Sequence, residues 1–200
     1  MTTNLNLGCH CGAVAGIARD ASVKTTTHLV CYCDDCQLYA KFLGHERTCD
    51  SRGGTEIVQC AMARIELTQG AEQLRAMRLS PKGMVRFYTA CCRTAVGNTM
   101  SGSVPFVGLV HTFINDLDRV GRDKLLGEAV GIQAKFARPQ APPGAYQTAP
   151  VIFMGRVAVR LLRWKLGGLN QPSAFYAPKT LSPVVAVDIL TKAERASLGG

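Results

Sequence analysis

The chain has 200 residues, of which 47% are hydrophobic and 18% charged, and its formal net charge at pH 7 is +9. This composition favours a compact domain with a substantial core and excludes a disordered chain. No run approaches the roughly 18 apolar residues of a membrane span, and the N-terminal segment lacks the basic and apolar regions of a signal peptide. We therefore expect a cytoplasmic protein with no transmembrane segment.

The positive charge is spread unevenly along the chain. Residues 1–115 carry 11 Lys and Arg against 8 Asp and Glu, whereas residues 116–200 carry 12 against 6. A basic protein can bind nucleic acid, an acidic membrane surface or a small carboxylate, but many basic proteins bind none of these. The excess lies mainly away from the cysteines, and charge alone does not lead us to expect a nucleic acid partner.

Short β-type runs separated by turn residues follow one another through the first half of the chain. The expected strands span 12–17, 27–30, 55–59, 64–68, 85–88 and 104–114, with a short helix at 35–42. The turn signals between them include Gln69-Gly70 and Gly97-Asn98. Residues 1–115 are therefore predicted to form a small antiparallel β domain, so the fold class is mainly β.

The second half of the chain has a different pattern. A helix is expected over 118–132, a proline-rich loop over 138–150 and a second helix over 151–166. Residues 116–200 are thus predicted to be a helical and loop-rich extension that packs on the β domain.

The helix expected at 151–166 is amphipathic and basic. Arg156, Arg160 and Arg163 fall at i, i+4 and i+7, which places them on one stripe of the helix. We interpret the segment as a helix packed on the β domain with its arginines in solvent. A peripheral contact with a membrane surface, a protein or nucleic acid stays open.

Seven of the nine cysteines are clustered. The clusters are Cys9 and Cys11 in GCHCG, Cys31, Cys33 and Cys36 in CYCDDC, and Cys91 with Cys92 in YTACCRT. In a chain without an export signal most thiols stay reduced, so clustered cysteines indicate metal ligands rather than disulfides. Thiolates at tight-turn spacing suit zinc.

The number of ligands predicts two zinc ions. Cys9 and Cys11 need distant partners, and the Cys91-Cys92 pair can close a four-sulfur structural site. The CYCDDC cysteines then surround a second ion with one position open to water or a substrate thiol, which is typical of a catalytic zinc. Whether Cys91, Cys92 or both bind the metal stays open.

Charged neighbours of CYCDDC have two interpretations each. Lys41, Arg86 and Arg93 are candidates to balance the negative charge of the cysteinates or to anchor a carboxylate, although each is more typical of a surface residue. Asp34 and Asp35 could relay protons, but aspartates in tight turns usually bond local backbone amides.

The remaining histidines and cysteines are expected to be structural. His10 could compete as a ligand, although in an extended turn it points away from Cys9 and Cys11. Cys60 lies in a strand pattern and is expected to be a buried apolar thiol, whereas Cys49 is expected in an exposed loop. The histidines expected to be packed or at the surface are His28, His45 and His111.

The order of these motifs resembles a known family. GCHCGAV, the C-x-C-x-x-C motif, GGTEIVQ and R-F-Y-x-x-C-C-R-T-x-x-G-N are similar to the glutathione-dependent formaldehyde-activating enzymes, which share their domain with centromere protein V. The resemblance covers about residues 5–115. It implies a β-tent zinc fold and carbon–sulfur lyase activity, the condensation of formaldehyde with glutathione to S-(hydroxymethyl)glutathione. Carried over by position, Cys9, Cys11 and Cys92 match structural ligands, and Cys31, Cys33 and Cys36 match the catalytic trio.

Two features depart from the family pattern. The family's late C-x-x-C-G motif has Thr89 at its first cysteine and Arg93 at its glycine, with Cys91 directly before Cys92. Residues 116–200 lie outside the resemblance. The alternative function is therefore a non-catalytic zinc-binding module whose basic C-terminal helix binds a protein, a membrane surface or nucleic acid.

Overall fold

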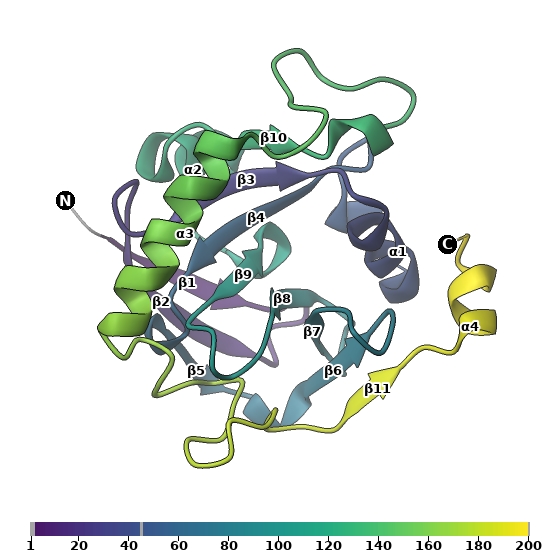
Figure 1. Ribbon diagram of the computed structural model, residues 1–200. Helices are drawn as coiled ribbons and strands as arrows, with labels where there is room; N and C mark the ends of the chain where they lie inside the picture. Colours follow the sequence, from purple (N-terminus) through teal and green to yellow (C-terminus); the bar gives the residue numbers. More distant parts are fainter. Residues whose placement is uncertain (1–2, 45, 200) are drawn as a thin grey trace.

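The structure is a computed structural model that describes residues 3–44 and 46–199, and it is built around two β-sheets (Figure 1). The strands are β1 Thr3–Gly8, β2 Ala15–Ala21, β3 Thr27–Cys31, β4 Thr55–Cys60, β5 Ile65–Gln69, β6 Leu74–Arg78, β7 Val85–Thr89, β8 Ala95–Thr99, β9 Val107–Val110, β10 Val130–Ile132 and β11 Val187–Ile189. The α-helices are α1 Asp34–Leu43, α2 Arg119–Leu126, α3 Val151–Leu166 and α4 Lys192–Ser197. Short 3-10 helices are η1 Glu46–Thr48, η2 Met62–Arg64, η3 Ala71–Gln73, η4 His111–Phe113 and η5 Ala134–Phe136. The expected mainly β class is confirmed.

The larger sheet has eight strands in the order β10-β3-β4-β9-β8-β7-β6-β11. Its inner strands are antiparallel, whereas β10 pairs parallel with β3 and β11 pairs parallel with β6. Both edge strands come from the second half of the chain. The C-terminal segment therefore takes part in the sheet and covers both of its edges, which would otherwise present unpaired backbone groups.

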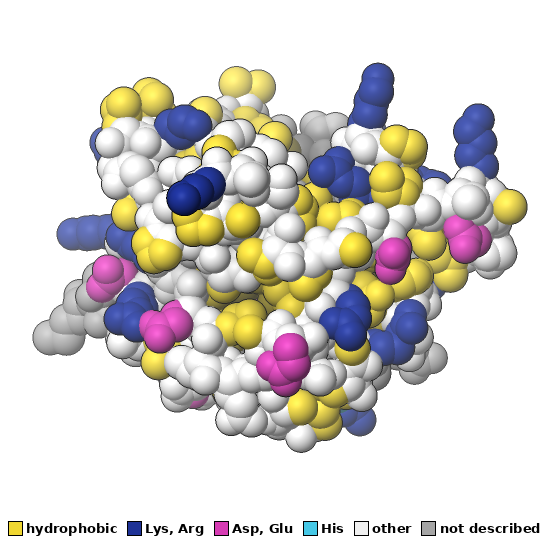
Figure 2. Space-filling model, turned by 90° about the horizontal axis from the view of Figure 1, so that it is seen from below, with side chains coloured by type: hydrophobic (Ala, Val, Ile, Leu, Met, Phe, Trp, Pro, Cys, Tyr) yellow, Lys and Arg dark blue, Asp and Glu magenta, His cyan; other side chains and the backbone are white. Residues whose placement is uncertain are grey.

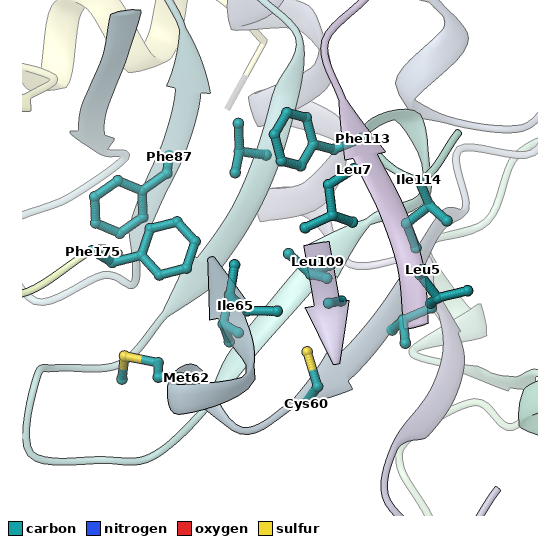
Figure 3. Close-up of a cluster of buried hydrophobic side chains, with 14 of the residues drawn as sticks. Leu5, Leu7, Cys60, Met62, Ile65, Phe87, Leu109, Phe113, Ile114 and Phe175 are labelled. Carbon is teal, nitrogen blue, oxygen red and sulfur yellow. The ribbon is translucent and has the colours of Figure 1, made fainter. Parts of the chain in front are cut away.

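The smaller sheet, in the order β1-β2-β5, packs its apolar face against the larger one. The side chains between them are large and fully buried, as Figure 3 shows for Phe87, Phe113, Leu109 and Leu7. Phe175, from the C-terminal segment, packs against Phe87 with ring centroids 4.8 Å apart and the rings tilted by 44°. Each such side chain contributes roughly 1.5–3 kcal/mol through burial, so this cluster holds the two sheets and the C-terminal segment together.

Two expected helices are confirmed, and one is shorter than predicted. The helices expected at 35–42 and 151–166 correspond to α1 and α3. The helix expected over 118–132 is wrong beyond Leu126, because Gly127 adopts a left-handed φ of 84° that ends α2. The residues that follow form β10, which pairs with β3.

Two expectations in the β half are also wrong. The single strand expected over 104–114 is the shorter β9 followed by η4. Gly97 and Asn98, expected to form a turn, lie inside buried β8. A Cβ at Gly97 would meet the carbonyl oxygen of Gly108 at 2.9 Å, so the glycine permits close strand packing and is not a turn signal.

Helix α3 lies diagonally across the front of the molecule in Figure 1. Its inner edge is formed by Phe153, Val157, Leu161 and Trp164, which are at least partly buried. The guanidinium of Arg160 on the same edge donates to the carbonyl oxygen of Thr26 and the hydroxyl of Thr27. Within the described residues, none of the helices has the length and apolar character needed to cross a membrane.

Candidate metal centres

The CYCDDC trio lies where a strand passes directly into a helix. Cys31 ends β3, Cys33 is the N-cap residue of α1, and Cys36 lies in the first turn of α1. The Sγ atoms of the three cysteines all lie within 4.8 Å of one another. A helix N-terminus favours negative charge, so this position also suits cysteinates.

The surroundings of the trio are mainly apolar. Cys31 and Cys36 are buried, and Cys33 is half-buried. Leu29 and Ile57 pack against the trio from β3 and β4, and Ile132 and Phe153 pack against it from β10 and α3. The C-terminal segment therefore supplies part of the wall of this site, which the sequence did not predict.

Arg86 is the basic residue that accompanies the trio. It is only 3% exposed, and its guanidinium lies 5.2 Å from the centre of the Tyr39 ring. Its Nη2 is 3.7 Å from Oδ2 of Asp35, whose Oδ1 accepts a hydrogen bond of 2.9 Å from Arg195 on α4. We expected Asp35 to bond local backbone amides. In the structure it pairs with Arg86 and Arg195 instead.

The charges of the trio and Arg86 influence one another. Hydrogen bonds from Cys31 and Cys33, together with the nearby Arg86, hold the pKa of Cys36 well below its usual range despite burial. Hydrogen bonds with Cys33 and Cys36, together with burial, raise the pKa of Cys31. The site therefore already favours negative charge on the sulfur of Cys36.

The other two candidate basic residues serve the ends of helices. Lys41 donates to the carbonyl oxygen of Leu198 at 3.1 Å. Arg93 donates to the carbonyl oxygens of Leu43 and Phe42, which end α1. Of the three basic residues proposed from the sequence, Arg86 is therefore the one placed to balance the cysteinates.

The second cluster joins the loop after β1 to the loop between β7 and β8. The Sγ atoms of Cys9, Cys11, Cys91 and Cys92 all lie within 4.8 Å of one another. Cys9 is 3.6 Å from Cys11 and 3.7 Å from Cys91, and Cys91 is 3.8 Å from Cys92, measured between sulfurs. Four sulfurs around a tetrahedral ion at about 2.3 Å are about 3.8 Å apart, so the donor set fits zinc.

Cys91 and Cys92 both belong to this cluster. Burial opposes the ionised form of Cys92, but hydrogen bonds with the hydroxyls of Thr89 and Thr94 and with Cys11 outweigh it and lower the pKa of Cys92 to about 5. Thr89, at the position where the resembled family has a cysteine, thus contacts a cluster sulfur through its hydroxyl. The departure from the family pattern leaves a four-sulfur set intact.

The other residues considered from the sequence lie outside both clusters. Cys60 is buried, as expected. Cys49 lies in a loop, as expected, but it is half-buried and hydrogen-bonded to the hydroxyl of Thr55 at 3.3 Å, so the expected exposure is wrong. His10 contacts Arg47, with 2.7 Å between the His10 Nε2 and Arg47 Nη1 atoms. Asp34 is exposed.

The isolated histidines differ in their surroundings. His111 is partly buried, its Nδ1 lies 3.3 Å from the carbonyl oxygen of Glu56, and burial lowers its pKa. His28 is buried, as expected for a packed histidine. His45 lies outside the described residues.

Sequence reasoning missed a buried ionic network beside the larger sheet. Oε1 of Glu56 accepts hydrogen bonds from Nε2 of His28 at 2.7 Å and Nε of Arg122 at 2.6 Å. A third bond joins Arg122 Nη2 to Oε2 of Glu56 at 2.8 Å. A charged residue, Glu56, at the second position of the predicted strand TEIVQ is the signal that could have indicated this network.

Comparison with known proteins shows the family to which the chain belongs. No curated protein matches the chain. The solved structures include a Rhodobacter sphaeroides protein from structural genomics that is 16% identical, with a TM-score of 0.41, covering 62% of this chain and 97% of that one. The family of unknown function DUF6151 matches residues 1–188, across both halves of the chain. The chain therefore belongs to the DUF6151 family.

Proposed function

We propose that the protein is a zinc-dependent enzyme of carbon–sulfur lyase type that acts on a thiol–aldehyde adduct such as S-(hydroxymethyl)glutathione. The observation that carries the proposal is the three-membered sulfur cluster of Cys31, Cys33 and Cys36. Among the described residues, no fourth His, Cys, Asp or Glu joins them within the same 4.8 Å. The four-sulfur cluster of Cys9, Cys11, Cys91 and Cys92 is proposed as a closed structural site.

Zinc held by the trio would supply a coordination position at which a substrate thiol loses its proton near neutral pH. In the forward reaction the sulfur forms a bond to the aldehyde carbon, and a proton is added to the aldehyde oxygen. The reverse reaction breaks the same carbon–sulfur bond and returns the thiol and the aldehyde.

The chain's own residues contribute charge balance and exclusion of water. Three cysteinates around a divalent ion leave a net charge of about −1, and the buried guanidinium of Arg86 lies beside Cys36 to offset it. Asp35 and Tyr39 hold Arg86 in place through an ion pair and a cation–π contact. Ile132 and Phe153 line the site with apolar surface, which strengthens these electrostatic interactions.

The test is exchange NMR of glutathione and formaldehyde with the zinc-loaded protein. We expect faster formation of S-(hydroxymethyl)glutathione than without protein, and loss of the acceleration in Cys36→Ser. The matched control is Cys49→Ser, since Cys49 lies outside both clusters and should leave the rate unchanged. A zinc-loaded protein that does not change the exchange rate would exclude glutathione chemistry and favour the non-catalytic alternative.

A further inference from the structure

The outward side of α3 is unusual because it is apolar. Val151, Ile152, Val159, Leu162 and Leu166, which we name the α3 outer face, are all exposed, and Val151 and Leu166 are 89% and 80% exposed. A surface helix normally turns its polar side to water and its apolar side to the core. Here the inner edge of α3 already packs on the protein, so the outer face is a second apolar stripe.

Basic side chains flank this stripe. Between Glu128 and Asp188 the sequence has seven Lys and Arg and no Asp or Glu. Arg156 and Arg163 lie on the outward side of α3 beside Ile152 and Val159. Because α3 combines exposed aliphatic side chains with positive charge and has no acidic residue, it matches a surface that is both apolar and negatively charged.

A cavity of about 660 Å³ continues the outer face toward the body of the protein. Its cationic lining is formed by Lys24, Arg64, Arg156, Arg160 and Arg163. In the described part of the chain none of these five pairs with a carboxylate, and those with recorded hydrogen bonds, Arg64 and Arg160, donate to backbone carbonyls or to the Thr27 hydroxyl. The cavity therefore has unbalanced positive charge that an anionic group would offset.

Figure 2 shows where side chains of each type lie on one face of the molecule. In this view from below, hydrophobic and basic side chains lie next to one another in the upper part, and both basic and acidic side chains lie in the middle and lower parts. Helix α4, at the other end of the larger sheet in Figure 1, is far from α3.

We propose that the α3 outer face docks on the surface of an anionic lipid bilayer. The aliphatic side chains would enter the boundary between headgroups and acyl chains, and the cavity arginines would receive lipid phosphates. Nucleic acid fits the same residues less well, because its phosphates would leave five aliphatic side chains uncovered. The one tryptophan, which could stack on a base, is buried at 6% exposure.

The experiment measures binding of the zinc-loaded 200-residue chain to vesicles by flotation. Phosphatidylcholine vesicles with and without phosphatidylserine are compared at low and at high salt. We expect binding that needs phosphatidylserine and weakens with salt, because surface potential provides part of the affinity. Absence of binding to phosphatidylserine vesicles, or equal binding to phosphatidylcholine alone, would overturn the proposal.

Paired variants separate the two components of the surface. Arg156→Gln with Arg163→Gln should lower vesicle affinity about 30-fold, since each cation near an anionic surface contributes on the order of 1 kcal/mol. Leu162→Gln with Leu166→Gln should abolish binding and leave the charge unchanged. The matched control, Lys82→Gln with Lys192→Gln, removes the same charge at exposed positions elsewhere and should bind like the wild type.

Two further results would assign the surface to another partner. Binding to duplex DNA that is lost in the arginine pair and retained in the leucine pair would overturn the membrane proposal in favour of nucleic acid. A dimer in analytical ultracentrifugation that dissociates in the leucine pair would overturn it in favour of a second copy of the chain. Unchanged circular dichroism and zinc content show that each variant is folded.

Discussion

At the scale of single residues, the pKa of the buried Glu56 carboxylate predicts how the stability of the protein depends on pH. Burial opposes its ionisation, but Arg122 and His28 outweigh this and lower the pKa of Glu56 from 4.5 to about 2. A lowered pKa in the folded state stabilises the protein above about pH 4.5, and this stabilisation is lost as the pH falls toward 2. Because a shift of one pKa unit corresponds to about 1.36 kcal/mol, this stabilisation is on the order of 3 kcal/mol.

Glu56→Gln should therefore be less stable than the wild type at pH 7 by on the order of 3 kcal/mol, and the gap should narrow below about pH 4.5 and close near pH 2. Urea unfolding of both proteins across this range measures the gap, and acid release of metal by the cysteines affects both alike. Glu66→Gln is the control, because Glu66 pairs with Arg19 at the exposed surface. A gap independent of pH would contradict the assigned role of Glu56.

The residues of the two sulfur clusters could be predicted from sequence because cysteines two or three positions apart share a turn. The pairing of Cys9 and Cys11 with Cys91 and Cys92 followed from counting ligands and from the family resemblance. The partners of Glu56 could not be predicted in this way, since His28 and Arg122 lie 28 and 66 positions away and meet only through the packing of the sheet. The apolar wall of the trio, formed partly by Phe153, depends on the same long-range packing.

At the scale of secondary-structure elements, Arg160 is expected to hold α3 to the sheet. Arg160→Ala would leave the carbonyl oxygen of Thr26 and the hydroxyl of Thr27 without their donor, at a cost of about 2 kcal/mol. Arg156→Ala, on the exposed side of the same helix, should change stability by less than about 0.5 kcal/mol. Urea denaturation compares the two, and equal losses would show that Arg160 has no special part in docking α3.

The elements themselves were predictable where local pattern decides them. Helices α1 and α3 follow from their apolar periodicity, and strand β4 follows from TEIVQ. Strand β8 was missed because Gly97-Asn98 reads as a turn, although the glycine is needed there for close approach to β9. Strands β10 and β11 have three residues each and are defined by their parallel neighbours, which no local pattern shows.

At the scale of the whole molecule, the two halves of the chain share one sheet. Strands β10 and β11 form its edges, and Phe175 enters the central core. We therefore expect a single cooperative unfolding transition. Fluorescence of Trp164, the one tryptophan, monitors α3, and far-ultraviolet circular dichroism monitors the sheets. The two midpoints should coincide, whereas separate transitions would show that residues 116–200 unfold independently.

The central claim is that the chain has two separate metal sites, a closed one of four cysteines and an open one of three. Native mass spectrometry of the zinc-loaded protein measures it most directly. We predict two zinc ions in the wild type and in Cys49→Ser, one in Cys36→Ser, one in Cys9→Ser and none when both cluster variants are combined. Two ions retained in Cys36→Ser, or both ions lost from it while the chain stays folded, would contradict the claim.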